Sequence, residues 1–540
     1  MINMVVGQVL VQGVVTDENS IPIPGVAVFA EGTSNIVYTD SVGRYSITDL
    51  TAGLHIVYFL KFGWLGVKKE ISIASRRIQL DTVKLWFGDV DNDGAINVKD
   101  VALIHEETSD SVSNKTRYMD SNTNGIVDSE DESKTMSAVE TAGVQCPEWL
   151  ISKPDYVTFI PAVSNPKFAT NQHYLITKLK NGRLLGIWTA GFMESSDNQS
   201  MLCHWSDDNG KTWSKYVVID GPQTDGKTAS WGFSIYVPER DRIYVFYNKD
   251  VGSRIYNQGV MKMKYSTDGG ENWSAAYTYT FEAGEYSPKD GSPPYWWVYQ
   301  NPIRVGNSYL VGFTEILSRY DDIFYSTEIR FLRFDNILTV DDPTALRITT
   351  FPSNGRAGLR GSYRAGTDRS TLQEPSLVQL SDGRLLCVMR SGQGFPYYSL
   401  SADSGKTWSI PMGLRFGDGL AYVPQPLASC PLFSLGNGNY VLIFHNNSVY
   451  ANGGTQAADW QKNRTPAFLL FGKEDLTKTQ PITFGTPIRF LENYVRPVGP
   501  QNRTEIATYP SMTEVNGEYI LWYPDRKHFL LGKKIPQPSY

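Results

Sequence analysis

A strand–turn–strand unit recurs six times between residues 181 and 520, and this repeat restricts the possible folds more than any other feature of the chain. In the fourth copy, residues 372–390, two apolar-rich strands flank the turn Ser381-Asp382-Gly383, which is typical of a hairpin. A radial array of such units, with one sheet per unit, is a β-propeller whose blade number equals the repeat number. We therefore predict an all-β fold with a six-bladed propeller, whose turns and second strands lie at residues 181–185, 240–244, 306–310, 382–386, 436–440 and 516–520.

A second motif supports the repeat. Ser401, Asp403, Gly405, Thr407 and Trp408 follow the spacing S-x-D-x-G-x-T-W, which is called an Asp box. In this motif the Ser and Asp side chains hydrogen-bond the backbone of the turn, and the Trp packs beneath it. Further copies lie at residues 206–213 and 266–273, the latter with Asn in place of Thr. A β-sandwich with similar hairpins is the alternative fold, and the three Asp boxes favour the propeller.

Composition limits the partners and the compartment. A chain of 540 residues exceeds what one core usually holds, so two or three domains are expected. The net charge of −6 argues against a nucleic-acid partner. No run of about eighteen apolar residues occurs, which predicts no membrane span, and residues 1–10 show no signal peptide. The compartment is therefore inferred from the domains, which are typical of secreted or cell-surface proteins. The cysteines lack disulfide or metal spacing and are expected to be buried free thiols: Cys146, Cys203, Cys387 and Cys430.

Residues 1–86 alternate apolar and polar positions between frequent turn signals, which predicts an antiparallel β-sandwich. Between Gly13 and Val28 the pattern G-x-V-x-D followed by P-x-P-G-V-x-V resembles the carboxypeptidase regulatory-like family. That resemblance implies a non-catalytic spacer or docking domain.

Residues 87–143 contain two acidic twelve-residue loops. Each places oxygen-bearing side chains at loop positions 1, 3, 5, 9 and 12, around a glycine at position 6 that permits a sharp turn. Hard oxygen ligands at this spacing predict two structural Ca²⁺ sites, and a solvated acidic linker is the alternative. The ligands are expected to be Asp89, Asp91, Asp93, Asn97 and Asp100 in the first loop, and Asp120, Asn122, Asn124, Asp128 and Asp131 in the second.

The paired loops resemble a dockerin, an EF-hand-like helical module. The resemblance rests on Asp at position 12 of each loop and on the 31 residues between the loop starts (120 − 89). It implies a cohesin-type protein partner, which dockerins bind through the helix after each loop. Val98 and Lys99 occupy the positions that usually face the cohesin, whereas the second helix is short and polar.

Residues 144–540 are expected to form the propeller. Counting outward from the six turns predicts which residues lie at the funnel end of each hairpin. The resulting set mixes acidic, basic, amide and aromatic side chains, which indicates a polar substrate pocket. Its members are Gln172, His173, Trp188, Thr189, Trp231, Asn248, Asn301, Glu315, Glu374, Arg390, Cys430, His445, Asn446, Tyr509 and Asp525.

The propeller resembles the sialidase (neuraminidase) superfamily over roughly residues 160–540. Glu374 precedes Arg390 across S-D-G-R-L-L, Arg464 lies in N-R-T-P-A-F-L-L, and Tyr509 lies in A-T-Y-P-S-M-T-E-V-N-G. The resemblance implies that Tyr509 and Glu374 form the nucleophile pair and that Arg390 and Arg464 bind a substrate carboxylate. A carboxylate beside the anomeric carbon of the substrate repels an anionic nucleophile, so a neutral phenol is a suitable replacement. Arginine binds such a carboxylate bidentately.

Two positions depart from the family pattern. Gln172 stands where the first of three arginines is expected, with His173 beside it, and Thr189 stands where the acid/base aspartate is expected. Neither replacement does the original task alone. Further candidates for substrate contact are Arg503, Glu315 and His445, and the candidates for the missing acid are Glu194, Asp197, His173, Glu315 and His445.

The leading functional prediction is a secreted glycoside hydrolase of exo-α-sialidase-like type, acting on a terminal acidic or modified sugar of a complex glycan. No catalytic cofactor is expected. The alternatives are a polysaccharide lyase, in which Tyr and His remove a proton beside a uronate carboxyl group, and a non-catalytic propeller that only binds glycans. A lyase creates an unsaturated chromophore, a hydrolase releases a reducing sugar, and a binding protein yields no product.

Overall fold

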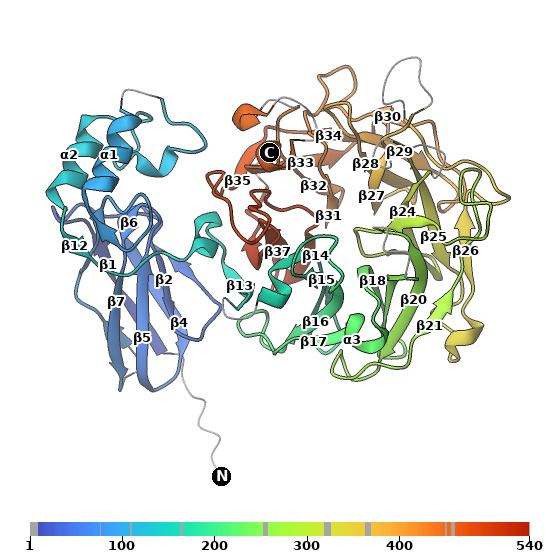
Figure 1. Ribbon diagram of the computed structural model, residues 1–540, viewed down its shortest axis with the longest axis horizontal. Helices are drawn as coiled ribbons and strands as arrows, with labels where there is room; N and C mark the ends of the chain where they lie inside the picture. The colour runs from blue at the N-terminus through green and yellow to red at the C-terminus, as the bar shows by residue number, and fades with distance from the viewer. Residues whose placement is uncertain are drawn as a thin grey trace, which may run out of the picture. The chain divides into compact units, whose positions relative to one another are not determined.

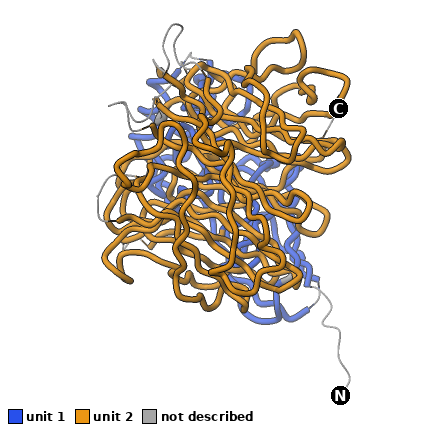
Figure 2. Tube along the Cα trace, turned by 90° about the vertical axis from the view of Figure 1, so that its right-hand side faces the viewer, with its two compact units in different colours: residues 1–157, 210–212, 492–496 blue, residues 158–209, 213–491, 497–540 orange. Residues whose placement is uncertain are grey.

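The computed structural model describes residues 9–538 except 76, 109–110, 163–165, 252–256, 318–325, 362–368, 449–450 and 455–458. The chain forms two compact units (Figures 1 and 2). The N-terminal unit comprises Met1–Val157, Gly210–Thr212 and Glu492–Arg496. The C-terminal unit comprises Thr158–Asn209, Trp213–Leu491 and Pro497–Tyr540. Both are built mainly from strands, and no helix in the described ranges is long and apolar enough to cross a bilayer.

Two sheets of the N-terminal unit enclose a core of alternating apolar residues. In β1 (Val9–Thr16), for example, every second residue from Val9 to Val15 is buried. The first sheet consists of β4 (Arg44–Leu50), β1, β8 (Arg77–Gln79) and β9 (Val83–Lys84). The second consists of β3 (Val37–Tyr38), β2 (Ala27–Ala30), β5 (Gly53–Leu60) and β7 (Val67–Ile73). Short strands β6 (Trp64–Leu65) and β10 (Trp86–Phe87) pair beside them.

The two acidic loops lead into α1 (Val98–Glu106) and α2 (Ser129–Ser137). Asn97 and Asp128 cap these helices by accepting backbone N–H bonds, and β11 (Ala95–Ile96) pairs with β12 (Thr141–Ala142). Short 3₁₀ turns follow at Arg117–Met119 and Glu148–Ser152. Ile104, Met119 and Val127 join the same hydrophobic cluster as the sandwich residues. The sequence-based boundary at residue 86 therefore falls inside one continuous core.

The C-terminal unit contains six antiparallel sheets among its described residues. Each begins with a long hairpin, so that neighbouring segments of the chain pair with one another. The sheets are, in chain order, β14 (Thr170–Lys178), β15 (Leu184–Gly191), β16 (Ser200–Ser206) and β17 (Val217–Asp220); β18 (Ala229–Val237), β19 (Arg242–Asp250), β20 (Gly259–Ser266) and β21 (Tyr277–Tyr279); β22 (Tyr295–Trp297), β23 (Ile303–Val305), β24 (Ser308–Ile316), β25 (Thr327–Phe334) and β26 (Ile348–Phe351); β27 (Gln373–Gln379), β28 (Leu385–Arg390), β29 (Tyr397–Ser401) and β30 (Met412–Gly413); β31 (Leu432–Gly436), β32 (Asn439–Phe444), β33 (Ala467–Glu474), β34 (Ile482–Phe484) and β35 (Ile488–Leu491); and β36 (Ser511–Val515), β37 (Glu518–Asp525), β38 (Phe529–Lys534) and β13 (Tyr156–Phe159).

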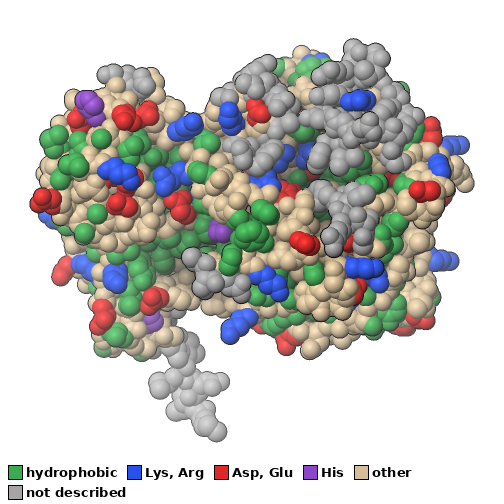
Figure 3. All heavy atoms as spheres, viewed as in Figure 1, with side chains coloured by type: hydrophobic (Ala, Val, Ile, Leu, Met, Phe, Trp, Pro, Cys, Tyr) green, Lys and Arg blue, Asp and Glu red, His purple; other side chains and the backbone are tan. Residues whose placement is uncertain are grey.

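Helices of the C-terminal unit are short. They are α3 (Pro222–Asp225) and α4 (Trp460–Asn463), with 3₁₀ turns at Pro166–Phe168, Pro343–Ala345 and Ala451–Gly453. Each of the six hairpin turns expected from the sequence joins two strands of one sheet, and every sheet of this unit contains one such turn. On the face seen in Figure 3, acidic and basic side chains are interspersed rather than gathered by sign.

Hydrogen bonds link residues on or beside the first strands of successive sheets into a closed series. Each bond joins a side chain at the start of one sheet to a backbone or side-chain group of the next, and the last returns from the sixth sheet to the first. The bonded groups are Thr177 with Ser234 (2.7 Å), Ser234 with Asn301 (3.0 Å), Leu377 with Gln300 (2.8 Å), Leu432 with Ser376 (3.0 Å), Tyr509 with Ser429 (3.2 Å) and Ile176 with Ser511 (2.9 Å).

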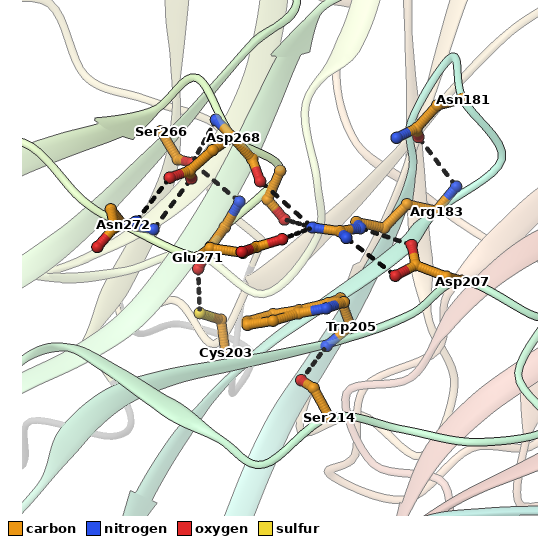
Figure 4. A network of polar contacts seen from close by, with 12 residues as sticks. Asn181, Arg183, Cys203, Trp205, Asp207, Ser214, Ser266, Asp268, Glu271 and Asn272 are labelled. Carbon is orange, nitrogen blue, oxygen red and sulfur yellow. Dashed lines mark hydrogen bonds and ion pairs between the residues drawn. The ribbon is translucent and has the colours of Figure 1, made fainter.

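The Asp-box turns connect neighbouring sheets. In Figure 4, Arg183, from the first hairpin turn, donates to Asp207 (2.7 Å) in the Asp box at 206–213 and to Glu271 (2.9 Å) in the Asp-box turn at 266–273. Gly270 of that turn has φ +100, and a Cβ there would lie 2.6 Å from Leu185 of the preceding sheet. Only glycine permits this backbone conformation and this close approach.

The hydrogen bonds within one Asp box generate a stability prediction. The carboxylate of Asp403 accepts from the backbone N–H (2.9 Å) and hydroxyl (2.6 Å) of Thr407 and from Ser401 (2.9 Å). We expect Asp403→Ala to lower the free energy of unfolding by about 1–2 kcal/mol, because the turn loses these acceptors. Chemical denaturation of the C-terminal unit measures this change. Asp290→Ala is the control and should change stability by less than about 0.5 kcal/mol, because Asp290 lies at an exposed turn where its carboxylate accepts from the N–H and hydroxyl of Ser292. Equal effects of the two substitutions would contradict the prediction.

Candidate functional site

Three sheets of the C-terminal unit break their register at the same end of the first strand. The breaks lie between Gln172 and Leu175, Ser230 and Phe233, and Gln373 and Ser376. Each break is a β-bulge, which re-aims a side chain. The residues at the breaks have positive φ, as does the residue two before β36: His173 (61), Trp231 (54), Glu374 (52) and Tyr509 (63).

These re-aimed side chains meet in the interior. The ring of Tyr509 lies 5.4 Å from that of Trp231 and 6.4 Å from that of His173, and His173 lies 5.5 Å from Trp231. Tyr299, from the third sheet, lies 6.1 Å from Tyr509. Left-handed backbone in residues other than glycine is strained, and such strain often marks a functional site. The bulges thus bring side chains from different sheets to one place.

Glu374, Arg390 and Tyr509 form what we term the central cluster. Arg390 Nη1 donates to Glu374 Oε1 at 2.6 Å and to the Tyr509 hydroxyl at 3.4 Å. The Tyr509 hydroxyl donates to the same Glu374 oxygen at 2.9 Å. The backbone N–H of Glu374 donates to Thr314 Oγ1, which holds the bulge in place. All three cluster residues are no more than 4% exposed.

The electrostatics of the central cluster keep the phenol protonated. Burial raises the pKa of Tyr509 above its usual range, and the Glu374 carboxylate raises it further, whereas Arg390 and Arg464 act in the opposite direction. Burial lowers the pKa of Arg390, and the neighbouring Glu374 and Tyr509 more than offset this effect, so the guanidinium stays charged. A neutral phenol hydrogen-bonded to a carboxylate can act as a nucleophile that passes its proton to that carboxylate.

Arg464 lies close enough to the cluster to affect the pKa of Tyr509. Its guanidinium donates through Nε (3.1 Å) and Nη2 (2.6 Å) to the carbonyl of Leu427. His445 contacts the same region, because its Nε2 lies 3.1 Å from the carbonyl of Ile506, whose N–H donates to the carbonyl of Arg464. Burial lowers the pKa of His445 to about 4, so its imidazole is neutral.

A buried charge network flanks Tyr509 on another side. Lys527 Nζ lies 5.3 Å from the Tyr509 ring and 2.9 Å from both carboxylate oxygens of Glu194. Arg503 pairs with Glu194 and, at 3.1 Å, with Glu505. Burial lowers the pKa of Lys527, and the two glutamates oppose this effect. Arg503 was expected from the sequence to reach the pocket, whereas Lys527 was not.

Lys527 also lies beside Gln172, the position at which the resemblance to sialidases implies an arginine. Its carbonyl accepts the backbone N–H of Asn171 at 2.7 Å, which places it beside Gln172. The signal for it in the sequence is the run Asp525-Arg526-Lys527 at the end of β37, of which only Asp525 was singled out.

Gln172 and His173 are both buried, at 1% and 0% exposed. Both amide atoms of Gln172 are buried and form no hydrogen bond with any part of the chain that the structure describes. Burial lowers the pKa of His173 to about 3, so its imidazole is neutral. At the remaining departure from the family pattern, the Thr189 hydroxyl accepts the N–H of Trp231 at 2.8 Å.

Glu315 is not brought to the central cluster. Thr314, its neighbour on β24, uses its side chain to bond Glu374, and side chains alternate along a strand, so Glu315 lies on the opposite face. There it pairs with Arg330 at 2.9 Å, and both side chains are fully buried. Asp197 lines a separate polar cavity of about 160 Å³ together with Asn248 and Asp250.

The two acidic loops share one pattern of hydrogen bonds. In the first, Asp89 accepts the N–H groups of Asp93 and Gly94. In the second, Asp120 accepts those of Asn124 and Gly125. At position 12, Asp100 and Asp131 accept the N–H groups at loop position 9, those of Asn97 and Asp128.

Carboxylate oxygens crowd together in the first loop. Those of Asp89, Asp91 and Asp93 lie within 4.8 Å of one another. Burial raises the pKa of Asp89 to about 7, with Asp100 and Asp93 adding to the rise against the N–H bonds that Asp89 accepts. Such crowding of oxygen donors fits a hard divalent cation. In the second loop Asn122 replaces an aspartate, and its carbonyl oxygen accepts the N–H of Asn124.

Comparisons with known proteins found one matching family model, one curated relative and several similar solved structures. Residues 11–85 match the family model of the CarboxypepD_reg-like domain. A TonB-dependent receptor, P39, from Formosa agariphila is 36% identical over 91 residues, which are 17% of this chain and only 8% of that protein. The similar solved structures include sialidases. A Hadza microbial sialidase shares 11% identity over 74% of this chain and 71% of its own, with a TM-score of 0.49. A mutant of the NanB sialidase from Streptococcus pneumoniae shares 12% identity over 97% of this chain and 94% of its own, also with a TM-score of 0.49.

The burial of the central cluster generates a second stability prediction. Arg390→Met leaves the Glu374 carboxylate without its cation in a buried site, so we expect a loss of about 3–5 kcal/mol in the free energy of unfolding. Adding Glu374→Gln should recover part of that loss. The matched control is Arg384→Met, since Arg384 pairs with Asp382 at the surface (28% and 32% exposed) and should contribute less than about 1 kcal/mol. Denaturant titrations of the three variants and the unchanged chain measure these values, and an Arg390→Met loss no larger than that of Arg384→Met would contradict the prediction.

Proposed function

We propose that the C-terminal unit is a six-bladed, sialidase-like propeller that acts as a glycoside hydrolase. The proposed substrate is a terminal acidic or modified sugar of a complex glycan. One observation carries the proposal: Tyr509 shares a buried hydrogen-bonded cluster with Glu374 and Arg390, which lie 135 and 119 positions before it in the chain. The closed series of hydrogen bonds among six sheets supports the propeller.

The proposed reaction begins when the Tyr509 oxygen attacks the anomeric carbon. Its proton passes to Glu374 Oε1, which already accepts it at 2.9 Å, and the bond from the anomeric carbon to the leaving oxygen breaks. Water then attacks the anomeric carbon and breaks its bond to the Tyr509 oxygen. Glu374 returns its proton to that oxygen, and the proton lost by the water neutralises the oxyanion that departed in the first step. A neutral phenol is suited to this step, because a substrate carboxylate repels an anionic nucleophile.

The substrate carboxylate is proposed to bind Arg390 and Arg464, which approach Tyr509 from different sheets. Gln172 supplies an uncharged amide where a third arginine is expected, and its atoms are free to bond a ligand group within the described structure. Lys527 and Arg503 add positive charge nearby, although each is paired with Glu194. We propose that this arrangement selects a sugar whose shape uses Gln172 and His173.

The described residues near Tyr509 offer no clear general acid to protonate the oxygen of the leaving group. Glu194 is paired with two cations and is therefore held as a carboxylate, and His173 and His445 are neutral. General acid help usually contributes about 10²–10⁴-fold. We therefore propose weak or absent activity on ordinary α-sialosides, and faster reaction with substrates whose leaving group needs no proton.

A non-catalytic glycan-binding propeller is the second candidate function. The observation that favours it is the burial of Tyr509 among Trp231, Tyr299 and His173, combined with Thr189 at the acid position. A lyase remains distinguishable by its unsaturated product.

For the N-terminal unit, we propose a carboxypeptidase regulatory-like sandwich joined to a dockerin-like module. The two acidic loops are proposed to bind structural Ca²⁺ through their side-chain oxygens, and α1 and α2 to present a surface to a cohesin-type partner. Val98, which begins α1, is 74% exposed and is an apolar residue available for such a partner. A secreted or cell-surface location is proposed from these domains together with the propeller.

Catalysis by the central cluster predicts a specific pattern of variants. Glu374→Gln and Tyr509→Phe should each lower kcat on an aryl α-sialoside at least about 100-fold. Tyr509→Phe should leave Tm nearly unchanged because it removes only a hydroxyl group, whereas Glu374→Gln should also lower Tm because it leaves the buried Arg390 guanidinium without its counterion. The control is Tyr299→Phe, another fully buried tyrosine that contacts Tyr509 and is assigned no proton-transfer role. Release of the aryl group and of a reducing sugar is measured together. Equal activity of Tyr509→Phe and Tyr299→Phe would reject the nucleophile, and an unsaturated product would indicate a lyase.

Calcium binding predicts a shift in one thermal transition. Adding Ca²⁺ at about 100 times its dissociation constant should stabilise the N-terminal unit by about 2.7 kcal/mol for each occupied site, and chelation should reverse this. The C-terminal transition should not move, because its core is separate. Asp89→Asn with Asp120→Asn should abolish the calcium response, whereas Asp81→Asn, exposed and outside both loops, should preserve it. Calorimetry that finds the first transition insensitive to chelator would exclude structural calcium.

A further inference from the structure

The N-terminal unit contains a cavity of about 270 Å³, here called the N-terminal cavity. Its walls come from the sandwich, the segment 112–125 that includes part of the second acidic loop, the 3₁₀ turn at Glu148–Ser152, and Tyr494. Tyr494 belongs to Glu492–Arg496, which is part of the same unit. Clefts for drug-sized ligands occupy about 300–1,000 Å³, so this cavity suits a single sugar ring.

One wall of the cavity is aromatic. The rings of Phe62 and Tyr118 are 4.8 Å apart, Tyr118 and Tyr494 are 5.0 Å apart, and Phe62 stacks on Tyr494 at 5.8 Å. Trp64 also lines the cavity. Interlocked aromatic side chains form a rigid apolar face at little entropic cost, which suits the C–H face of a pyranose ring.

The charge of the lining is unbalanced. Lys61, Lys153 and Arg117 line the cavity, and Asp120 is its one acidic lining residue among those described, so the formal lining charge is +2 (3 − 1). Asp120 is also the first proposed calcium ligand of the second loop, where a bound cation would offset its charge. An anion in this cavity would thus meet a positive potential on one side and aromatic rings on the other.

Lys61 and Lys134 differ in their ion pairing. Lys61 and Lys134 each lie 5.1 Å from the Trp64 ring. Lys134 is neutralised by Asp17 at 2.9 Å, whereas no carboxylate among the described residues forms an ion pair with Lys61. Burial lowers the pKa of Lys61 to about 7, and repulsion by Lys153 and Lys134 adds to this effect. A cation without a counterion in a partly desolvated cavity is a natural partner for a ligand carboxylate.

We propose that the N-terminal cavity binds one acidic sugar residue, with its carboxylate beside Lys61 and Lys153 and its ring against Phe62 and Tyr118. This site is independent of the proposed hydrolase site and would hold the chain on acidic glycans whether or not the propeller is catalytic.

Lysine footprinting on the full chain tests the proposal at the residue concerned. An amine-reactive reagent is applied in calcium-containing buffer, with or without glucuronic acid, N-acetylneuraminic acid, glucose or N-acetylglycine, and modification of each lysine is measured by mass spectrometry. The acidic sugars are expected to protect Lys61 at least fivefold and to leave Lys134 unchanged, while glucose and N-acetylglycine protect neither. Protection by N-acetylglycine equal to that by the acidic sugars would overturn the sugar assignment, and no protection of Lys61 would overturn the site.

Variants separate charge recognition from folding. Calorimetric titration with the better acidic sugar should show at least tenfold weaker binding for Lys61→Met, which keeps the aliphatic chain, and for Tyr118→Ala. Lys134→Met is the matched control, since it removes an ammonium at the same distance from Trp64 but outside the cavity, and should change affinity less than twofold. An unchanged affinity in a folded Lys61→Met chain, or an equal loss in Lys134→Met, would contradict the proposal. Unchanged thermal unfolding of each variant establishes that its fold is intact.

Discussion

The closed series of hydrogen bonds between successive sheets is the constraint on which the C-terminal unit depends. Six sheets share it, and its members lie on or beside the first strands, where the residues with left-handed backbone also lie. A residue such as Glu374 or Tyr509 occupies left-handed backbone at a cost of about 1–3 kcal/mol. Such strain persists only when neighbouring sheets over-determine the position. The hydroxyl of Thr314, in the third sheet, accepts the backbone N–H of Glu374. The hydroxyl of Ser429, just before β31 of the fifth sheet, accepts the backbone N–H of Tyr509.

Burial gives the central cluster both its chemistry and its fragility. Desolvation keeps the Tyr509 phenol protonated and strengthens its bond to Glu374, and Arg390 compensates the charge that Glu374 carries. The same desolvation makes every unpaired charge costly, which explains why Lys527, Arg503, Glu194 and Glu505 occur as a connected network rather than singly. Gln172 stands apart, because its buried amide has no partner in the described structure, and a ligand group would satisfy it.

The repeated hairpins were predictable from the sequence, whereas the direction in which individual side chains point was predictable only in part. The hairpin turns follow from short turn motifs such as Ser381-Asp382-Gly383, whose chemistry is local, and each lies between two strands as expected. Pairing among Glu374, Arg390 and Tyr509 was also anticipated, because hairpin ends meet at one place. Glu315 was expected in the pocket, but strand alternation turns it toward Arg330, and the sequence does not reveal which face of β24 packs on β27. Lys527 was missed, since its approach to Tyr509 depends on the backbone after β37.

The proposal that Tyr509 in this buried cluster attacks an acidic sugar is tested most directly by covalent trapping. The full chain is incubated with a fluorinated sialosyl fluoride, whose good leaving group needs no acid and whose second fluorine slows release of the intermediate. Intact-mass measurement and peptide mapping then locate any adduct. We expect one glycosyl group per chain, attached to Tyr509 and absent in Tyr509→Phe. A folded chain that forms no adduct, or forms one on a different residue, would contradict the proposal.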